Sequence, residues 1–318
     1  MTILEQFKQG DRRALSRIIT HVENRRSNYR EILAELSRME SKAYRVGITG
    51  PPGAGKSTLV DAVITRYVKQ GLKIGVVAVD PSSPFTGGAL LGDRVRMQHL
   101  ANTESVFVRS MASRGQTGGI AAATRDVVRV LDAFGMDLIL IETVGIGQIE
   151  IAVVEACDSV VVVLVPESGD MIQTMKAGLM EIADVFCVNK IDRPGGERLL
   201  GILNMMIHER LGAKDEEIQA VGTNAVTGDG VDLLLERIAQ HRRIITDCGE
   251  YEDRRKRQLK TEIIFAVRDR VARDLDKLLD FDAEFEAMSD KLMTGKTDPY
   301  SVADEIYEHY FRGRLVNG

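Results

Sequence analysis

The chain has 318 residues, of which 44% are hydrophobic and 28% are charged, and its formal net charge is −5. This length and composition are typical of a globular protein with a large core, and they favour one domain with extensions over two equal domains. The acidic balance argues against a nucleic-acid-binding surface. The three cysteines argue against a disulfide framework, and Cys157 and Cys187 lie in or beside apolar runs that predict buried thiols.

No segment of the sequence predicts a membrane span or a signal peptide. The longest apolar runs, such as Val160–Val165, have the length of a strand and fall far short of the ~20 residues that a membrane span needs. Residues 1–13 lack the apolar core of a signal peptide. We therefore expect a cytoplasmic protein without a membrane partner.

Residues 1–42 are predicted to form an N-terminal helical extension, because apolar residues recur there at helical spacing. Gly10 and Asp11 indicate a break followed by a helix start. Strands and helices then alternate over residues 43–248. The predicted strands are 43–49, 72–79, 105–109, 137–142, 159–165, 185–188 and 218–221, and helices are expected near 57–70, 118–134, 197–211 and 230–243.

The predicted strands are rich in Val and Ile without polar alternation, which is typical of strands buried on both faces. This pattern predicts the α/β class, with a mostly parallel sheet covered by helices. Residues 252–312 contain no strand candidate, so residues 249–318 are predicted to form a C-terminal helical extension. Within it, the basic run Arg254–Arg257 is expected to be a solvated helix face rather than a binding patch.

Residues 50–57 read Gly-Pro-Pro-Gly-Ala-Gly-Lys-Ser and match the P-loop pattern GxxxxGK[ST] between a predicted strand and a predicted helix. The glycines allow a tight turn whose N–H groups, together with the helix start, hold anionic phosphates. Lys56 is expected to reach the β- and γ-phosphates, and Ser57 to bind Mg²⁺. The alternative, a turn that merely precedes a helix, does not explain why both flanks fit a P-loop NTPase. The predicted phosphate-binding residues are Gly53, Ala54, Gly55, Lys56, Ser57 and Thr58.

Residues 189–192 read Asn-Lys-Ile-Asp and directly follow a predicted strand, where ligand crevices of such sheets lie. The Asp192 carboxylate can accept hydrogen bonds from the ring N–H and the exocyclic amine of guanine, which adenine does not offer in that arrangement. Lys190 can lie along the base, and Asn189 can tie the loop together. The alternative is a turn whose Asp caps the next helix. Backbone N–H groups of Thr223, Asn224 and Ala225 are candidates for the guanine oxygen, although small polar residues are also common in turns.

Acidic residues at strand ends are candidates for a magnesium site. Glu142 ends a predicted strand, where Mg²⁺ or its water shell needs a carboxylate, and Gly145 lets a backbone N–H approach the γ-phosphate. Asp80 also ends a strand, but it serves equally well as a turn residue before Pro81. Asp93 is a further candidate, and taken alone it reads as a helix N-cap. Gln148 is a candidate for orienting the attacking water.

Two loops have the features of nucleotide-sensing switches. Residues 81–98 are rich in Gly, Ser, Pro and Arg and are long for a connection inside a compact sheet. Residues 166–176 are the second candidate, and a plain strand-to-helix loop is the alternative there.

The motifs together resemble the MeaB/ArgK GTPases, which are chaperones of adenosylcobalamin-dependent acyl-CoA mutases such as methylmalonyl-CoA mutase. The resemblance covers nearly the whole chain. Besides the P-loop, it rests on the segments Asp80–Arg94, Glu142–Gln148 and Asn189–Asp192, and it extends to Gly10–Arg17, Lys176–Asp184 and Asp298–Tyr300. One departure is Ile149, since a small polar residue is usual after the glutamine.

The resemblance implies a GTPase domain with helical extensions and a homodimer formed through the C-terminal part. It implies that Ser57, Asp80, Asp93 and Glu142 form the magnesium site. It also implies that residues 166–176 are a switch toward the mutase, with Asp170 and Lys176 as participants. The implied function is a GTP-hydrolysing chaperone that gates cofactor loading and protects or reactivates the mutase. Its cofactors would be GTP or GDP and Mg²⁺. Its catalytic residues would be Lys56, Glu142 and Gln148.

Three other functions remain as alternatives. An ATP-dependent kinase or transport ATPase is a name attached to similar sequences, but Asp192 argues against it. A metal-insertion GTPase commonly carries His-rich or CxC segments, and neither occurs in this sequence. A non-catalytic interaction module would not need complete phosphate, metal and base motifs.

Overall fold

The computed structural model describes residues 2–80, 103–112, 117–143, 145, 156–168, 182–211, 220–279 and 282–308. The chain forms two compact units, Met1–Gln258 and Leu259–Gly318. The first unit contains the sheet and the candidate nucleotide site.

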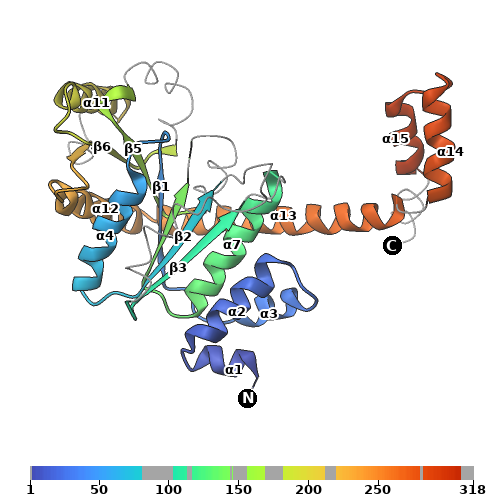
Figure 1. Ribbon diagram of the computed structural model, residues 1–318, viewed down its shortest axis with the longest axis horizontal. Coiled ribbons are helices and arrows are strands. Elements are labelled where there is room, and N and C mark those ends of the chain that lie inside the picture. The colour runs from blue at the N-terminus through green and yellow to red at the C-terminus, as the bar shows by residue number, and fades with distance from the viewer. Residues whose placement is uncertain are drawn as a thin grey trace. The chain divides into compact units, whose positions relative to one another are not determined.

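A seven-stranded sheet forms the centre of the first unit (Figure 1). Its strands run in the order β3-β2-β4-β1-β5-β6-β7, and each neighbouring pair is parallel. This confirms the prediction of a mostly parallel sheet. The strands are β1 (Tyr44–Thr49), β2 (Ile74–Asp80), β3 (Val106–Ala112), β4 (Leu138–Thr143), β5 (Ser159–Leu164), β6 (Val185–Asn189) and β7 (Val221–Thr223).

Two apolar cores cover the two faces of the sheet, because successive side chains of a strand point to opposite faces. In β5, Val160 and Val162 face the first core, whereas Val161 and Val163 face the second. Helices that contribute to the first core are α1 (Ile3–Lys8), α2 (Arg12–Glu23), α3 (Tyr29–Leu36), α7 (Thr117–Ala133) and α11 (Gly196–Leu211). Those of the second core are α4 (Lys56–Lys69) and α12 (Val231–Asp247). Burial on both faces explains why the strands lack polar alternation.

The N-terminal helices pack on the first core. Gly10 has a φ of +84°, and Asp11 caps α2 by accepting hydrogen bonds from the backbone N–H groups of Arg13 and Ala14. The predicted break and helix start are thus present. Leu15 and Ile18 on α2 are fully buried, so the extension shares the core of the sheet.

The last strand ends later in the chain than predicted. An apolar run predicted a strand at 218–221, whereas β7 spans Val221–Thr223 and pairs with Cys187–Asn189 of β6. Hydropathy locates an apolar run, but the register with the neighbouring strand decides which residues form the ladder. The shift matters for the site, because it places Thr223 opposite Asn189.

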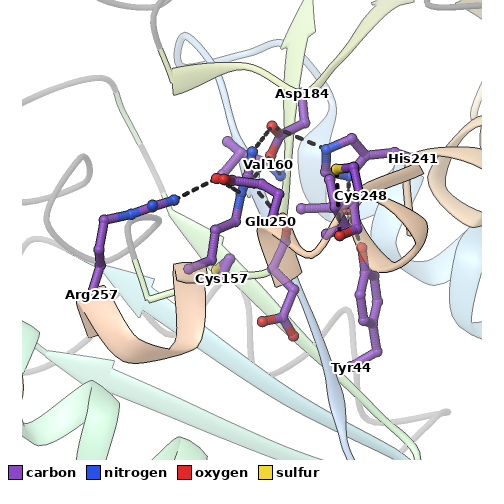
Figure 2. A network of polar contacts seen from close by, with 12 residues as sticks. Tyr44, Cys157, Val160, Asp184, His241, Cys248, Glu250 and Arg257 are labelled. Carbon is purple, nitrogen blue, oxygen red and sulfur yellow. Dashed lines mark hydrogen bonds and ion pairs between the residues drawn. The ribbon is translucent and has the colours of Figure 1, made fainter. Parts of the chain in front are cut away.

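A polar network lies where β1, β5 and β6 begin, at the edge of the sheet away from the phosphate loop (Figure 2). A hydrogen bond of 2.6 Å joins the hydroxyls of Tyr44 and Ser159, and another of 2.6 Å joins Ser159 Oγ to Nδ1 of His241 on α12. His241 Nε2 lies 3.2 Å from Oδ1 of Asp184, and Arg254 donates to both carboxylate oxygens at 2.8 Å. The contacts connect a serine, a histidine and an aspartate in the same order as in a hydrolase triad. Because Ser159 is fully buried, however, the network is structural.

The same network anchors the start of α13 (Glu250–Leu279). Arg254 and Arg255 on its first turns contact Asp184 and Asp158, which precede β6 and β5. Cys157 and Cys187 are buried as predicted, and burial raises the pKa of the Cys187 thiol to about 12. Both thiols therefore stay protonated at neutral pH and serve the core.

The second unit is helical. It holds α13 from Leu259 onward, α14 (Asp282–Met293) and α15 (Pro299–Tyr307). Asp298 caps α15 by accepting hydrogen bonds from the N–H groups of Tyr300 and Ser301, and Pro299 occupies the first helical position. No helix in the described ranges is both long and apolar enough to cross a membrane.

Candidate nucleotide-binding site

The phosphate loop, residues 50–57, leaves the end of β1 and leads directly into α4. At Gly50 φ is +152°, and an added Cβ would lie 2.1 Å from the carbonyl oxygen of Val163 in β5. At Gly55 φ is +81°, and an added Cβ would lie 2.5 Å from Nδ2 of Asn189. Neither position admits a side chain. The glycines of the motif therefore let the loop pack against β5 and against Asn189, the last residue of β6.

Lys56 is the first residue of α4 and is only 6% exposed, which is rare for lysine. Its ammonium donates hydrogen bonds to the carbonyl oxygens of Gly50, at 2.8 Å, and Pro51, at 2.9 Å. The charge is thus held within the loop. Because the N-terminus of α4 adds partial positive charge at the same place, the loop favours phosphate oxygens as ligands.

Ser57 and Glu142 bring together two oxygen ligands beside the phosphate loop. The Ser57 hydroxyl donates to Oε1 of Glu142 at 2.6 Å, and the Glu142 side chain on β4 is buried. β2 lies beside β4 with Val79 opposite Thr143, so Asp80 ends the adjacent strand at the same edge. Hydroxyl and carboxylate oxygens are the ligands that Mg²⁺ prefers, so this donor set fits a magnesium ion.

Two threonines that the sequence analysis missed connect β1 to the segment after β4. Thr143 Oγ1 donates to Thr49 Oγ1 at 2.9 Å, and Thr49 Oγ1 donates to the carbonyl oxygen of Gly145 at 3.0 Å. Both threonines are fully buried. Gly145 is thereby held beside the start of the phosphate loop. In the sequence, Thr49 ends a predicted strand just before the phosphate loop, and Thr143 directly follows another predicted strand. These positions could have identified the two threonines as site residues.

Asn189 joins the phosphate loop to the segment after β7. Its Nδ2 donates to the carbonyl oxygen of Ala54 at 2.8 Å, and its Oδ1 accepts from the Ala225 N–H at 3.0 Å and from the Thr223 hydroxyl at 3.2 Å. Next to it, Lys190 has a φ of +57° and donates through Nζ to the carbonyl oxygen of Gly53 at 2.8 Å. A left-handed lysine is uncommon and is favoured here by these surrounding contacts.

Asp192 is exposed, and the side chain of Asn224 orients it. Its Oδ1 accepts a hydrogen bond of 2.9 Å from Nδ2 of Asn224. The Oδ1 of Asn224 accepts in turn from the backbone N–H groups of Val226 and Thr227, at 3.1 and 3.2 Å. Both ends of the Asn224 amide are therefore fixed, and the Asp192 carboxylate keeps lone pairs available for a ligand.

The structure brings the predicted phosphate, base and metal residues to one edge of the sheet, as far as they are described. Gly53 and Thr58 are exposed at the phosphate loop. Four of the predicted site residues lie outside the described residues, and the side chain of Asp80 is not described. These positions are Asp93, Gln148, Asp170 and Lys176. In the described ranges, no three His, Cys, Asp or Glu side chains form a metal-binding group.

A phosphate loop after the first strand and an Asn-Lys-x-Asp segment that begins at the last residue of β6, on a parallel α/β sheet, define the class of P-loop GTPases. The model of one family, described as methylmalonyl-CoA mutase-associated GTPase MeaB, matches residues 15–278. The chain belongs to this family, and it binds and hydrolyses GTP.

Similar proteins agree with this placement. A GTPase of Pyrococcus horikoshii is 45% identical over 312 residues, covering 96% of each chain. The mitochondrial methylmalonic aciduria type A homolog of Mus musculus is 29% identical, over 95% of this chain and 77% of that protein. The crystal structure of a LAO/AO transport system kinase superposes with a TM-score of 0.69 at 26% identity, over 96% of each chain.

Proposed function

We propose that GTP and Mg²⁺ bind at the edge of the sheet where the strands end. Lys56 and the backbone of residues 53–58 hold the phosphates, supported by the N-terminus of α4. Asp192 selects guanine, and the turn from Thr223 to Ala225 faces the base edge. The proposed magnesium residues are Ser57, Asp80, Asp93 and Glu142, and the buried contact between Ser57 and Glu142 supports this choice.

The residues of this chain stabilise the reacting phosphates by charge and position. Lys56 neutralises developing charge on the β- and γ-phosphates, and a Mg²⁺ ion held by Ser57 and Glu142 would supply further positive charge. Glu142 keeps Ser57 oriented toward the metal position. We propose that Gln148 orients the water molecule that attacks the γ-phosphate. For the isolated protein, unaided turnover is expected at about 10⁻⁴ to 10⁻² s⁻¹, as in GTPases that receive no arginine from a partner.

We further propose that this GTPase is the chaperone of an adenosylcobalamin-dependent acyl-CoA mutase. It gates cofactor loading and helps to protect or reactivate the mutase. The observation that carries the proposal is the match of a family described as mutase-associated over residues 15–278. The name of the murine relative supports the same role. The name of the similar crystal structure suggests a kinase, but a carboxylate at Asp192, oriented by Asn224, favours guanine over adenine.

The test is a pull-down of a purified adenosylcobalamin-dependent mutase with the GTPase in its GTP, GDP and nucleotide-free forms. We expect capture to depend on the nucleotide, and GTP hydrolysis by the recovered pair to exceed that of the GTPase alone by about tenfold or more. The same assay in EDTA is expected to lose hydrolysis. Equal capture in all three forms, with an unchanged rate, would contradict the chaperone role.

Variants of the proposed switch residues can be tested in the same assay. If residues 166–176 transmit nucleotide state to the mutase, Asp170→Ala and Lys176→Ala should retain GTP affinity but lose mutase-stimulated hydrolysis. Asp247→Ala, at an exposed carboxylate on α12, is the matched control and should keep full stimulation. A normal response from both switch variants would remove this segment from the proposal.

We also propose a homodimer formed through α13. Exposed apolar side chains recur on it at a spacing of four residues, at Leu259, Ile263, Val267 and Val271, with exposures between 47% and 65%. On a helix this spacing gives one apolar stripe, which water disfavours unless a partner covers it. Ile263→Glu is expected to convert a dimer to a monomer in sedimentation velocity, whereas Ala272→Glu, on the other side of α13, should not. A monomeric parent protein would disprove the proposal.

A further inference from the structure

The guanidinium of Arg66 joins the helix of the phosphate loop to the turn that follows β7. Arg66 lies on α4, and its Nη2 donates to the carbonyl oxygen of Gly228 at 2.8 Å. Its Nε donates to Asp232 on α12 at 2.7 Å, and its Nη1 donates to the carbonyl oxygen of Ala62 at 3.2 Å. The Arg66 side chain is 22% exposed, whereas that of Asp232 is 76% exposed. The three donors thus hold one largely enclosed cation in a single orientation.

The partner of Arg66 is a turn that is closed by its own backbone. We call residues 224–230 the base turn. Within it the N–H of Gly228 donates to the carbonyl oxygen of Asn224 at 2.8 Å, and the N–H of Asn224 donates to that of Asp229 at 2.9 Å. At Gly228 φ is +88°, and an added Cβ would lie 2.8 Å from Arg66 Nη2. Glycine therefore permits the close approach of the turn to the guanidinium.

The opposite end of the base turn carries the contacts of the base site. Asn224 donates to the Asp192 carboxylate, and the Ala225 N–H donates to Asn189, which also holds the carbonyl oxygen of Ala54. The turn is thus tied to the phosphate loop at its inner end and to Arg66 at its outer end. Arg66 lies ten residues beyond Lys56 on the same helix, a rise of about 15 Å along α4.

We propose that Arg66 is a positioning residue for guanine recognition, which fixes the base turn relative to the phosphate loop. Attachment through Asn189 to the phosphate loop, together with attachment through Gly228 to α4, prevents the turn from pivoting about Asn189. The orientation of the Asp192 carboxylate follows from that of Asn224, and a recognition group displaced by about 0.5 Å or more loses its hydrogen bonds. The proposal rests on the base site proposed above.

The contact with the Gly228 carbonyl, rather than the ion pair, carries this role. Asp232 is mostly exposed, and ion pairs of exposed groups contribute little. The hydrogen bond to Gly228 is charge-assisted and partly buried, and such bonds are the stronger kind. The two contacts can be separated by mutation, because Asp232→Asn removes the charge of the partner and leaves Arg66 bonded to the turn.

The experiment compares Arg66→Met and Asp232→Asn with the parent protein. Dissociation constants are measured for GDP, for IDP and for inorganic tripolyphosphate. IDP lacks the exocyclic amine of guanine, so the ratio of the IDP to the GDP constant reports base reading, whereas tripolyphosphate reports the phosphate loop alone. We expect Arg66→Met to weaken GDP binding about tenfold and to reduce this ratio. Tripolyphosphate binding and the melting temperature of the nucleotide-free protein should change little.

Asp232→Asn is expected to leave all three constants within about twofold. The proposal is overturned if Arg66→Met leaves GDP binding unchanged, if it weakens GDP and tripolyphosphate equally, or if Asp232→Asn reproduces its effect. Failure of the base site itself gives a different result, because the parent protein would then bind IDP as tightly as GDP. A parent protein that discriminates, together with a neutral Arg66→Met variant, rejects only the role of Arg66.

Discussion

Asp192→Asn is expected to transfer the preference of the protein from guanosine to xanthosine nucleotides. Guanine presents two donors to this position, and a carboxylate accepts both. An asparagine offers one acceptor and one donor, so its amide would face a guanine donor, and a site that leaves such a group unpaired discriminates strongly. Xanthine carries a carbonyl oxygen in place of the exocyclic amine, and the amide can donate to it.

The structure also fixes which way the new amide would point. Asn224 donates through Nδ2 to Oδ1 of Asp192, and its own Oδ1 is held by two backbone N–H groups. An asparagine at 192 therefore keeps its carbonyl oxygen toward Asn224 and presents its NH₂ group where the second carboxylate oxygen lies. We expect GTP affinity to fall by about 100-fold to 1,000-fold and XTP affinity to rise.

Calorimetric titration with GTP, XTP and ATP measures the transfer. Asp232→Asn makes the same chemical change at an exposed carboxylate on α12 and should leave all three affinities unaltered. If Asp192→Asn still prefers guanosine nucleotides, the carboxylate does not read the base. If the parent protein binds ATP as tightly as GTP, the segment Asn189–Asp192 does not select guanine over adenine.

The sequence predicts the phosphate and base residues because they lie in short motifs next to recognisable strands. Gly50–Ser57 and Asn189–Asp192 each follow an apolar run, and in a parallel sheet all such runs end at one edge. The motif alone does not reveal how its residues are held. Asn189 contacts both Ala54 and Ala225. This bridge depends on the register between β6 and β7, and hydropathy predicted β7 too early in the chain.

The basic run Arg254–Arg257 shows a second limit of sequence reasoning. It was expected to be a solvated helix face, and Lys256 and Arg257 are indeed exposed. Arg254 and Arg255 instead contact Asp184 and Asp158, which lie 70 and 97 residues earlier in the chain. Adjacent residues of a helix point in different directions, so a run of like charges does not share one environment. The carboxylate partners are set by the tertiary fold.

The ion pair of Arg254 leads to the second large effect. Asp184→Asn is expected to lower the free energy of unfolding by about 2–4 kcal/mol at pH 7, because removing one partner of a buried pair leaves the other uncompensated. Oδ2 of Asp184 accepts from Arg254 and from the backbone N–H of Val160, at 2.8 and 2.9 Å. An amide nitrogen there would face two donors. Asp253→Asn, at an exposed carboxylate that pairs with Lys256, should cost less than about 0.5 kcal/mol.

The pH dependence distinguishes this charge effect from a loss of packing. Burial alone raises the pKa of Asp184, but the hydrogen bonds and charges of His241 and Arg254 outweigh it and lower the pKa to about 2 in the folded protein. A carboxylate whose pKa is depressed on folding stabilises the protein above its unfolded pKa of about 3.9 and loses that contribution as pH falls toward 2. The shift corresponds to about 2 kcal/mol. Urea unfolding followed by circular dichroism should therefore show a difference between parent and Asp184→Asn that is full at pH 7 and narrows between pH 4 and 2. A difference that stays constant over this range would mean that side-chain shape, and not ionisation, holds the start of α13 to the sheet.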